Sequence, residues 1–208
     1  MAKLPSKKMI LMHFDARDPI MAAVIREKGA FKLSRNRNYF LVLCKAIIGQ
    51  QISIKAADSI TKRVQSLFKN KVPTPEKMEA ISDESLRQSG LSGQKVKYLK
   101  DLAAKFLDGS IRTRRFHYQS NEEIIATLTT VYGIGTWTAE MFLIFSLGRL
   151  NVLPIADLGL QAGIKKIYKM RGLPSPKRML ALGEKWHPME TVGTWYAWRI
   201  QDAEIISY

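Results

Sequence analysis

The chain has 208 residues, of which 46% are hydrophobic and 25% charged, a composition typical of a folded globular protein. Its 33 Lys and Arg residues against 18 Asp and Glu give a net charge of +15, which favours a polyanionic partner: nucleic acid first, an anionic membrane surface second. No apolar run reaches the roughly 18 residues of a membrane span, and the apolar patch after the basic N-terminus is too short for a signal peptide.

Cysteine and histidine usage argues against disulfide and metal chemistry. Cys44 is the only cysteine, so an intramolecular disulfide is excluded, and its apolar neighbours predict a small buried side chain. His13, His117 and His187 are too scattered to indicate a zinc site.

Helical spacing of apolar residues recurs along the chain, whereas strand-like alternation is scarce. We therefore predict an all-α protein. With no internal repeat, low-complexity tract or long linker, residues 1–208 are predicted to form one compact unit. In chain order, the predicted helices are 20–28, 38–50, 53–68, 75–80, 83–89, 94–107, 121–131, 137–147, 158–168, 176–182 and 191–205.

The most informative stretch is 131–139, Val-Tyr-Gly-Ile-Gly-Thr-Trp-Thr-Ala. Gly133 and Gly135 allow a tight turn and the close approach of a negatively charged group to the main chain. The helix that follows presents its positive N-terminus there, which is a suitable seat for a phosphate. This pattern predicts a helix-hairpin-helix, although a Gly-x-Gly before a helix is in isolation more often just a tight connection.

An acidic residue follows the predicted hairpin helix. Gly148 is a plausible glycine just past the helix end, and a loop containing Pro154 then leads to Asp157. Taken alone, Asp157 is best interpreted as the cap of the helix that begins near Leu158.

The hairpin, Trp137 and the late Asp157 together resemble the helix-hairpin-helix glycosylase superfamily. The segments 43–53, 90–98 and 195–199 resemble those of its DNA-3-methyladenine glycosylase members of the alkylpurine type. Four separated motifs in the correct order, over roughly residues 15 to 200, are far more specific than one hairpin.

This resemblance implies two helical lobes with the DNA cleft between them, one of about 38–150 and one of about 1–37 and 151–208. It implies a minimal helical form, since nothing in the chain has the strand pattern of an extra β domain. The single cysteine excludes the four-cysteine iron–sulfur cluster of some relatives. No cofactor is expected, apart from a monovalent cation that could sit at the hairpin when DNA is bound.

The resemblance also assigns roles to particular residues. Asp157 would stabilise the positive charge that develops on the sugar and help to activate water. Trp137 stands where some members carry a Schiff-base lysine, so simple hydrolysis is expected. Trp137 and Tyr39 rank first as walls of the base pocket, although most aromatic residues of the chain are expected in the core. Gln50 and Gln51 correspond to the residues that fill the gap left by an extruded nucleotide.

Contacts to the DNA backbone are expected from two turns. The hairpin contributes Gly133, Ile134, Gly135 and Thr136, and a second turn contributes Gly93 and Lys95. The basic runs at 95–100 and 112–115 are expected to meet phosphates in part, which predicts binding that weakens with salt and reads little sequence.

The expected function is therefore a monofunctional DNA glycosylase for 3-methyladenine and 7-methylguanine that acts on duplex DNA as an intracellular monomer. It would act in the cytoplasm or nucleoid of a bacterium or in the nucleus of a eukaryote. One departure from the family leaves substrate preference open: Met189 and Glu190 stand where many relatives carry an aromatic residue and an arginine.

Three alternatives stay open on the sequence. The first is a glycosylase for hypoxanthine, ethenoadenine or an oxidised purine. The second is a catalytically silent protein that binds DNA structures, with Asp157 as a helix cap only. The third and weakest is an RNA-binding helical module.

Overall fold

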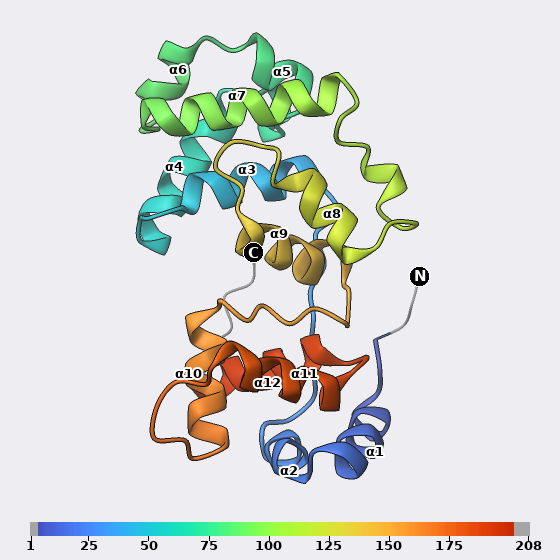
Figure 1. Cartoon of the computed structure of the whole chain (residues 1–208). Coiled ribbons are helices and arrows are strands. Elements are labelled where there is room, and N and C mark those ends of the chain that lie inside the picture. Colours follow the sequence, from blue (N-terminus) through green and yellow to red (C-terminus); the bar gives the residue numbers. More distant parts are fainter. Residues whose placement is uncertain (1–3, 202–208) are drawn as a thin grey trace. The chain divides into compact units, whose positions relative to one another are not determined.

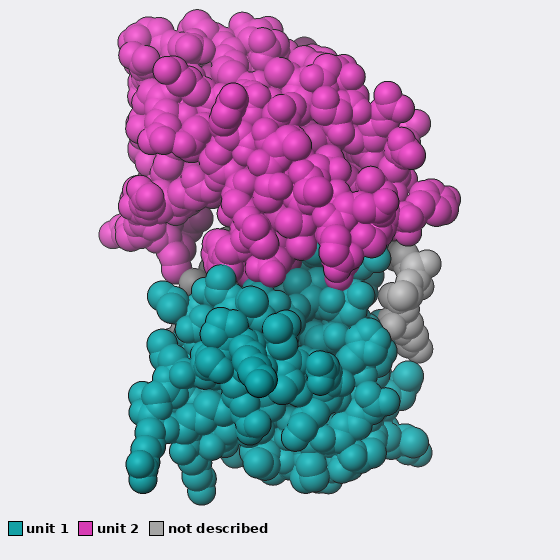
Figure 2. Space-filling model, in the orientation of Figure 1, with its two compact units in different colours: residues 1–35, 143–207 teal, residues 36–142, 208 magenta. Residues whose placement is uncertain are grey.

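The computed structural model describes residues 4–201, and these residues form helices and turns with no strand (Figure 1). The predicted all-α class is therefore confirmed. The described residues divide into two compact units, one of residues 4–35 and 143–201 and one of residues 36–142, and Figure 2 colours each separately. We call them the terminal unit and the central unit.

The central unit is built from short helices that pack mainly on one longer helix. Its α-helices are α3 (Tyr39–Gly49), α4 (Ile54–Ser66), α5 (Pro75–Ala80), α6 (Asp83–Gln88), α7 (Gly93–Leu107), α8 (Asn121–Leu128) and α9 (Thr136–Phe142), with 3₁₀ turns at Lys69–Lys71 and Thr113–Arg115. Helix α7 contacts α3, α5 and α6, and its buried face consists of Val96, Leu99, Leu102 and Ala103. Helix α7 is thus the framework of this unit.

Polar caps define where these helices begin. Ser53, Ser92 and Ser120 each accept a hydrogen bond from a main-chain amide in the first turn of α4, α7 and α8. Such caps satisfy amides that have no partner within the helix. Cys44 is buried in α3, as predicted, and this burial raises the pKa of its thiol.

The terminal unit contains α1 (Lys7–Arg17), α2 (Pro19–Glu27), a π-helical turn (Leu143–Leu147), α10 (Leu158–Ile167), α11 (Pro176–Trp186) and α12 (Glu190–Gln201). Helices α10 and α12 pack closely because Gly163 has no side chain. A Cβ there would lie 2.2 Å from the Ala197 carbonyl oxygen. This contact brings the middle of α12 against the first turns of α10.

A buried carboxylate joins three elements of the terminal unit. Asp18 is 3% exposed and caps α2 through the Met21 amide. It also accepts hydrogen bonds from the Tyr168 hydroxyl and from the Trp186 indole nitrogen at 3.0 Å. Burial, together with the hydrogen bond to Asp18 and the negative charge of that carboxylate, raises the pKa of Tyr168.

Several element boundaries differ from the sequence predictions. Helix α1 was not predicted, because Met9 and Met12 are exposed on the face opposite the buried Ile10 and Phe14, and this obscures the helical period. Helix α11 extends beyond the predicted end at 182. The predicted helix 137–147 is in fact α9 followed by the π-helical turn, and Gly148 ends it with a φ of +69°, as predicted. Positions 202–205 of the last predicted helix lie outside the described residues.

Candidate DNA-binding turns and carboxylate site

The central unit carries a hollow of about 690 Å³ between the ends of α3, α7 and α9. Its lining includes Gln50, Gln51, Lys95, Gly133 and Trp137, which are among the residues singled out in the sequence. Other lining residues include Lys45, Ser92, Gln94, Tyr98, Gly135, Met141 and Phe142.

The predicted hairpin is a tight turn between α8 and α9. The Ile134 amide donates to the Val131 carbonyl at 3.1 Å, and the Ile134 side chain is buried. Ile134 therefore anchors the hairpin in the core, whereas Gly135 and Thr136 lie exposed at its surface. Because α9 begins at Thr136, the positive end of the helix lies at this surface.

The two hairpin glycines differ in what surrounds them. Gly133 has a φ of +82°, and a Cβ there would lie 2.2 Å from Cδ2 of Tyr98. Gly135 has no positive φ, and a Cβ there would meet nothing within 4 Å. Gly133 is thus required by the fold, while Gly135 leaves the main chain open to an approaching group.

The end of α3 is attached to the hairpin. The Gln50 side-chain amide donates to the Gly133 carbonyl at 2.6 Å. Gln51, the next residue, is exposed and has a φ of +57°, in the left-handed region. The glutamine pair therefore forms a sharp, exposed turn that is fixed to the hairpin on one side.

The second predicted DNA-facing turn joins α6 to α7. The positive-φ glycine is Gly90, with a φ of +94°, whereas Gly93 begins α7 with ordinary helical geometry. The Lys95 ammonium donates to the carbonyls of Ile48 and Gln50 at 2.7 and 2.8 Å. This lysine therefore has partners within the protein. The burial of its ammonium lowers its pKa.

The two aromatic residues ranked highest in the sequence have different surroundings. Trp137 is 40% exposed and lines the hollow. The ring of Tyr39 packs edge-on against Phe142 at 5.4 Å between centroids and tilted against Phe116 at 6.4 Å. Tyr39 is not among the residues that line this hollow.

In the terminal unit, Asp157 caps α10 and is 9% exposed. Its Oδ1 accepts hydrogen bonds from the Leu160 amide at 2.6 Å and from the Trp198 indole nitrogen at 2.8 Å. The Trp198 ring is stacked on Phe145 at 5.9 Å. The cap interpretation of Asp157 is therefore correct as geometry, and the carboxylate is held in one orientation by two donors.

Trp198 is the residue that the sequence reasoning missed. The motif Trp195-Tyr-Ala-Trp-Arg199 contains two large aromatics that are buried in the core, Trp195 and Tyr196. Successive helical residues turn by about 100°, so Trp198 points about 60° away from Trp195 and about 160° away from Tyr196 around α12, and it is only half-buried. Only the packing of α10 on α12 reveals that it reaches Asp157.

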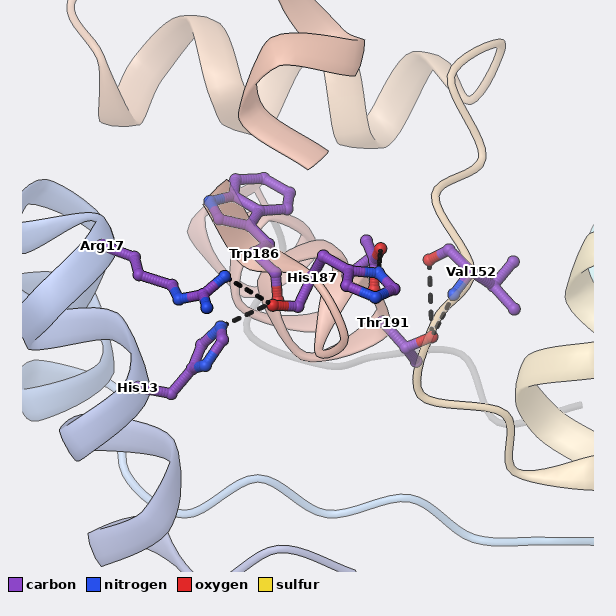
Figure 3. A network of polar contacts seen from close by, with 7 residues as sticks. His13, Arg17, Val152, Trp186, His187 and Thr191 are labelled. Carbon is purple, nitrogen blue, oxygen red and sulfur yellow. Dashed lines mark hydrogen bonds and ion pairs between the residues drawn. The ribbon is translucent and has the colours of Figure 1, made fainter. Parts of the chain in front are cut away.

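The loop before Asp157 is clamped at several points, some of which appear in Figure 3. The Thr191 amide donates to the Leu150 carbonyl, and the Thr191 hydroxyl donates to the Arg149 carbonyl and accepts from the Val152 amide. The Asp157 amide in turn donates to the Pro154 carbonyl at 2.9 Å. These bonds fix the path of the chain that leads to the carboxylate.

Figure 3 also shows how α1 supports the end of α11. His13 contacts the Trp186 carbonyl at 2.9 Å, and Arg17 donates to the His187 carbonyl at 3.1 Å. Glu190, the residue where the chain departs from many relatives, pairs with Nδ1 of His187 at 2.8 Å. Its carboxylate thus has a partner within the terminal unit.

Two other observations concern chemistry and location. Within residues 4–201, no group of three or more His, Cys, Asp and Glu side chains could hold a metal ion. In the same part of the chain, no helix combines the length and the apolar character needed to cross a bilayer.

Residues 44–189 match the family described as HhH-GPD superfamily base excision DNA repair protein. This chain belongs to the HhH-GPD superfamily. The family predicted from the motifs is therefore confirmed.

Individual relatives cover nearly the whole chain. DNA-3-methyladenine glycosylase 1 of Schizosaccharomyces pombe is 33% identical over 193 residues, which span 90% of this chain and 85% of the relative. A crystal structure of DNA-3-methyladenine glycosidase from Bacillus halodurans gives a TM-score of 0.85 at 37% identity, covering 91% of this chain and 88% of that one. A Schizosaccharomyces pombe 3-methyladenine DNA glycosylase in complex with abasic DNA gives 0.81 at 31% identity, covering 96% and 98%.

The hairpin of this HhH-GPD protein yields a prediction about its two glycines. Gly133→Ala should destabilise the protein by about 2–4 kcal/mol, because it adds positive-φ strain and a clash with Tyr98. Gly135→Ala should change the free energy of unfolding by less than about 1 kcal/mol, since its Cβ enters open space. Urea denaturation of both variants measures this. Equal effects of the two substitutions would contradict the hairpin geometry.

Proposed function

We propose that this protein is a monofunctional DNA glycosylase that hydrolyses the N-glycosidic bond of alkylated purines, 3-methyladenine and 7-methylguanine, in duplex DNA. The extruded base would be released and an abasic site left for base excision repair. The observation that carries the proposal is the similarity over nearly the full chain to DNA-3-methyladenine glycosylases, combined with an Asp157 carboxylate held by two donors.

Asp157 is the proposed catalytic residue. Cleavage of the glycosidic bond develops positive charge on the sugar, and a nearby carboxylate stabilises that charge and orients the attacking water. The hydrogen bonds from Leu160 and Trp198 both reach Oδ1. We propose that they hold the carboxylate in the orientation that stabilises the sugar, and that Trp198 is a positioning residue for it.

Hydrolysis without strand cleavage follows from the residue at the start of α9. An indole at Trp137 cannot form a Schiff base with the sugar, so a covalent intermediate of that kind is not expected here. The product would be a free base and an intact strand. Alkylated purines are cationic and leave easily, so one carboxylate suffices as catalytic machinery.

The central unit would supply the contacts to DNA. We propose that the hairpin, Gly133–Thr136, and the start of α7 at Gly93 receive backbone phosphates, and that Gln50 and Gln51 fill the gap left by the extruded nucleotide. Lys45 also lines the hollow, and an ammonium there suits the DNA backbone better than a cationic base. The net charge of +15 favours this binding over a wide surface.

Trp137 is the proposed wall of the base pocket, because its exposed indole face can attract a cationic purine. Tyr39 as a second wall stays a proposal from the family resemblance. No cofactor is proposed, apart from a monovalent cation at the hairpin in the DNA complex. The protein would act as a monomer on duplex DNA in the compartment that holds the genome.

One observation favours a second candidate, a silent DNA-structure binder. Asp157 is a well-formed helix cap, and a cap alone would account for its burial and its bond to Leu160. This candidate predicts binding of DNA without base release. A glycosylase for hypoxanthine, ethenoadenine or an oxidised purine would instead release a different base.

The central prediction concerns products. Wild-type protein incubated with methylated duplex DNA should release 3-methyladenine or 7-methylguanine, identified by chromatography and mass spectrometry. The strand should stay intact until alkali is added, and borohydride should trap no covalent adduct. Parallel duplexes with hypoxanthine, ethenoadenine or 8-oxoguanine identify another lesion specificity. Tight binding with no released base from any of them would overturn the proposal.

A second prediction separates the π face of Trp137 from its bulk. Trp137→Leu should slow the release of 7-methylguanine about tenfold through loss of the cation–π attraction, and Trp137→Phe should recover most of it. Single-turnover rates measure the effect. Tyr132→Leu is the matched control, since Tyr132 is an exposed hairpin aromatic outside the hollow lining. Equal rates for the Leu and Phe variants of Trp137 would exclude a role for the ring.

A further inference from the structure

One face of α7 contacts both turns that the proposed function places on DNA. Lys95, Tyr98 and Asp101 are spaced three residues apart, so they follow one another along the same side of the helix. Helix α7 is held by the Ser92 cap and by its buried apolar face. These three side chains therefore extend from a rigid element.

Lys95 reaches the end of α3. Its ammonium donates to the carbonyls of Ile48 and Gln50, at 2.7 and 2.8 Å. The last carbonyls of a helix have no amide partner within it and carry the negative end of its dipole, so a half-buried cation is well placed there. The bond to the Gln50 carbonyl lies directly before Gln51, whose φ is +57°. Lys95 thus fixes the main chain at the start of the exposed glutamine turn.

Tyr98 and Asp101 reach the hairpin. The Tyr98 ring lies so close to Gly133 that no Cβ fits between them. The Asp101 carboxylate accepts a hydrogen bond from the Tyr132 amide at 2.8 Å. Gln50 closes the arrangement, because its side chain donates to the Gly133 carbonyl. The glutamine turn and the hairpin are therefore tied to the same helix and to each other.

We propose that Lys95 is a positioning residue that holds the Gln50–Gln51 turn in register with the hairpin, so that the turn can occupy the gap left by an extruded nucleotide. Two of its three ammonium protons are donated within the protein, which opposes the alternative role of a phosphate contact. This inference rests on the proposed function, since it assigns a device for the gap-filling step. Lys100 on the same helix contacts the carbonyls of Glu79 and Ile81 at the end of α5, a similar use of a lysine.

The test compares binding of Lys95→Met and wild type to two inert duplexes, one undamaged and one with a tetrahydrofuran abasic analogue, over a range of salt concentrations. A positioning role predicts that the preference for the abasic duplex falls about tenfold, because a loosened turn no longer fills the gap. The slope of log affinity against log salt should stay unchanged. Lys95→Arg, which keeps donors for the two carbonyls, should restore the preference.

Two further variants make the result decisive. Lys97→Met removes an exposed lysine of the same helix and should leave the preference unchanged, whatever it does to overall affinity. Lys95→Gln shortens the side chain and removes its charge while it keeps a polar group at the position, so it should reproduce the loss of preference even if Lys95→Met fails to fold.

A phosphate contact by Lys95 would instead weaken both duplexes equally and lower the salt slope by about one. That result, or an unchanged preference in both Lys95→Met and Lys95→Gln, overturns the inference. Because neither duplex is a substrate, failure here is separate from failure of base release, which the product experiment measures on its own.

Discussion

The proposed chemistry depends on the carboxylate of Asp157 and the two hydrogen bonds that its Oδ1 accepts. One comes from the main chain of α10 and the other from the indole of Trp198 on α12. A group that stabilises developing charge is effective only if its orientation is set before the reaction, so that no reorganisation is needed. The same contact that caps the helix therefore prepares the carboxylate for the proposed chemistry.

This interaction is itself a product of packing. Trp198 reaches Asp157 because α10 and α12 approach closely at Gly163 and Ala197. The preceding loop is held by Thr191, which bonds to the main chain at Arg149, Leu150 and Val152. A small change at Gly163 or at Thr191 would therefore shift the Asp157 carboxylate, although neither residue is among its hydrogen-bond donors Leu160 and Trp198. In the central unit, packing also sets the position of exposed groups, because Lys95 and Asp101 of α7 form hydrogen bonds with the glutamine turn and the hairpin.

Much of this could be predicted from the sequence because it is encoded locally. Apolar spacing identified most of the helices, the Gly-x-Gly pattern identified the hairpin, and Gly148 marked a helix end. What failed depended on contacts between distant segments. Helix α1 has apolar residues on two faces, so its helical period is not visible in the sequence. The π-helical turn at Leu143–Leu147 has a wider hydrogen-bonded turn than an α-helix, and the spacing of apolar residues does not distinguish the two.

The candidate site shows the same division. The spacing of Asp157 from the hairpin made it the candidate acid through the family resemblance, but its partner Trp198 lies 41 positions away and no local pattern links them. Lys95 was expected to meet phosphate because it stands in a basic run of a chain with a net charge of +15; that its ammonium donates to the carbonyls of Ile48 and Gln50 depends on a contact between distant segments. Trp137 was ranked as a pocket wall although such residues are more often core, and it proves to be partly exposed at the hollow.

The most direct test removes the negative charge of Asp157 while it keeps the side chain's role as the N-cap of α10. Asparagine caps a helix as well as aspartate does and can still accept the bonds from Leu160 and Trp198, so Asp157→Asn should fold normally and bind DNA. The account predicts that its single-turnover rate of base release from methylated duplex DNA falls about 100-fold or more, because the negative charge is gone. Release at the wild-type rate by a folded, DNA-binding Asp157→Asn protein would reduce Asp157 to a helix cap and contradict the proposed mechanism.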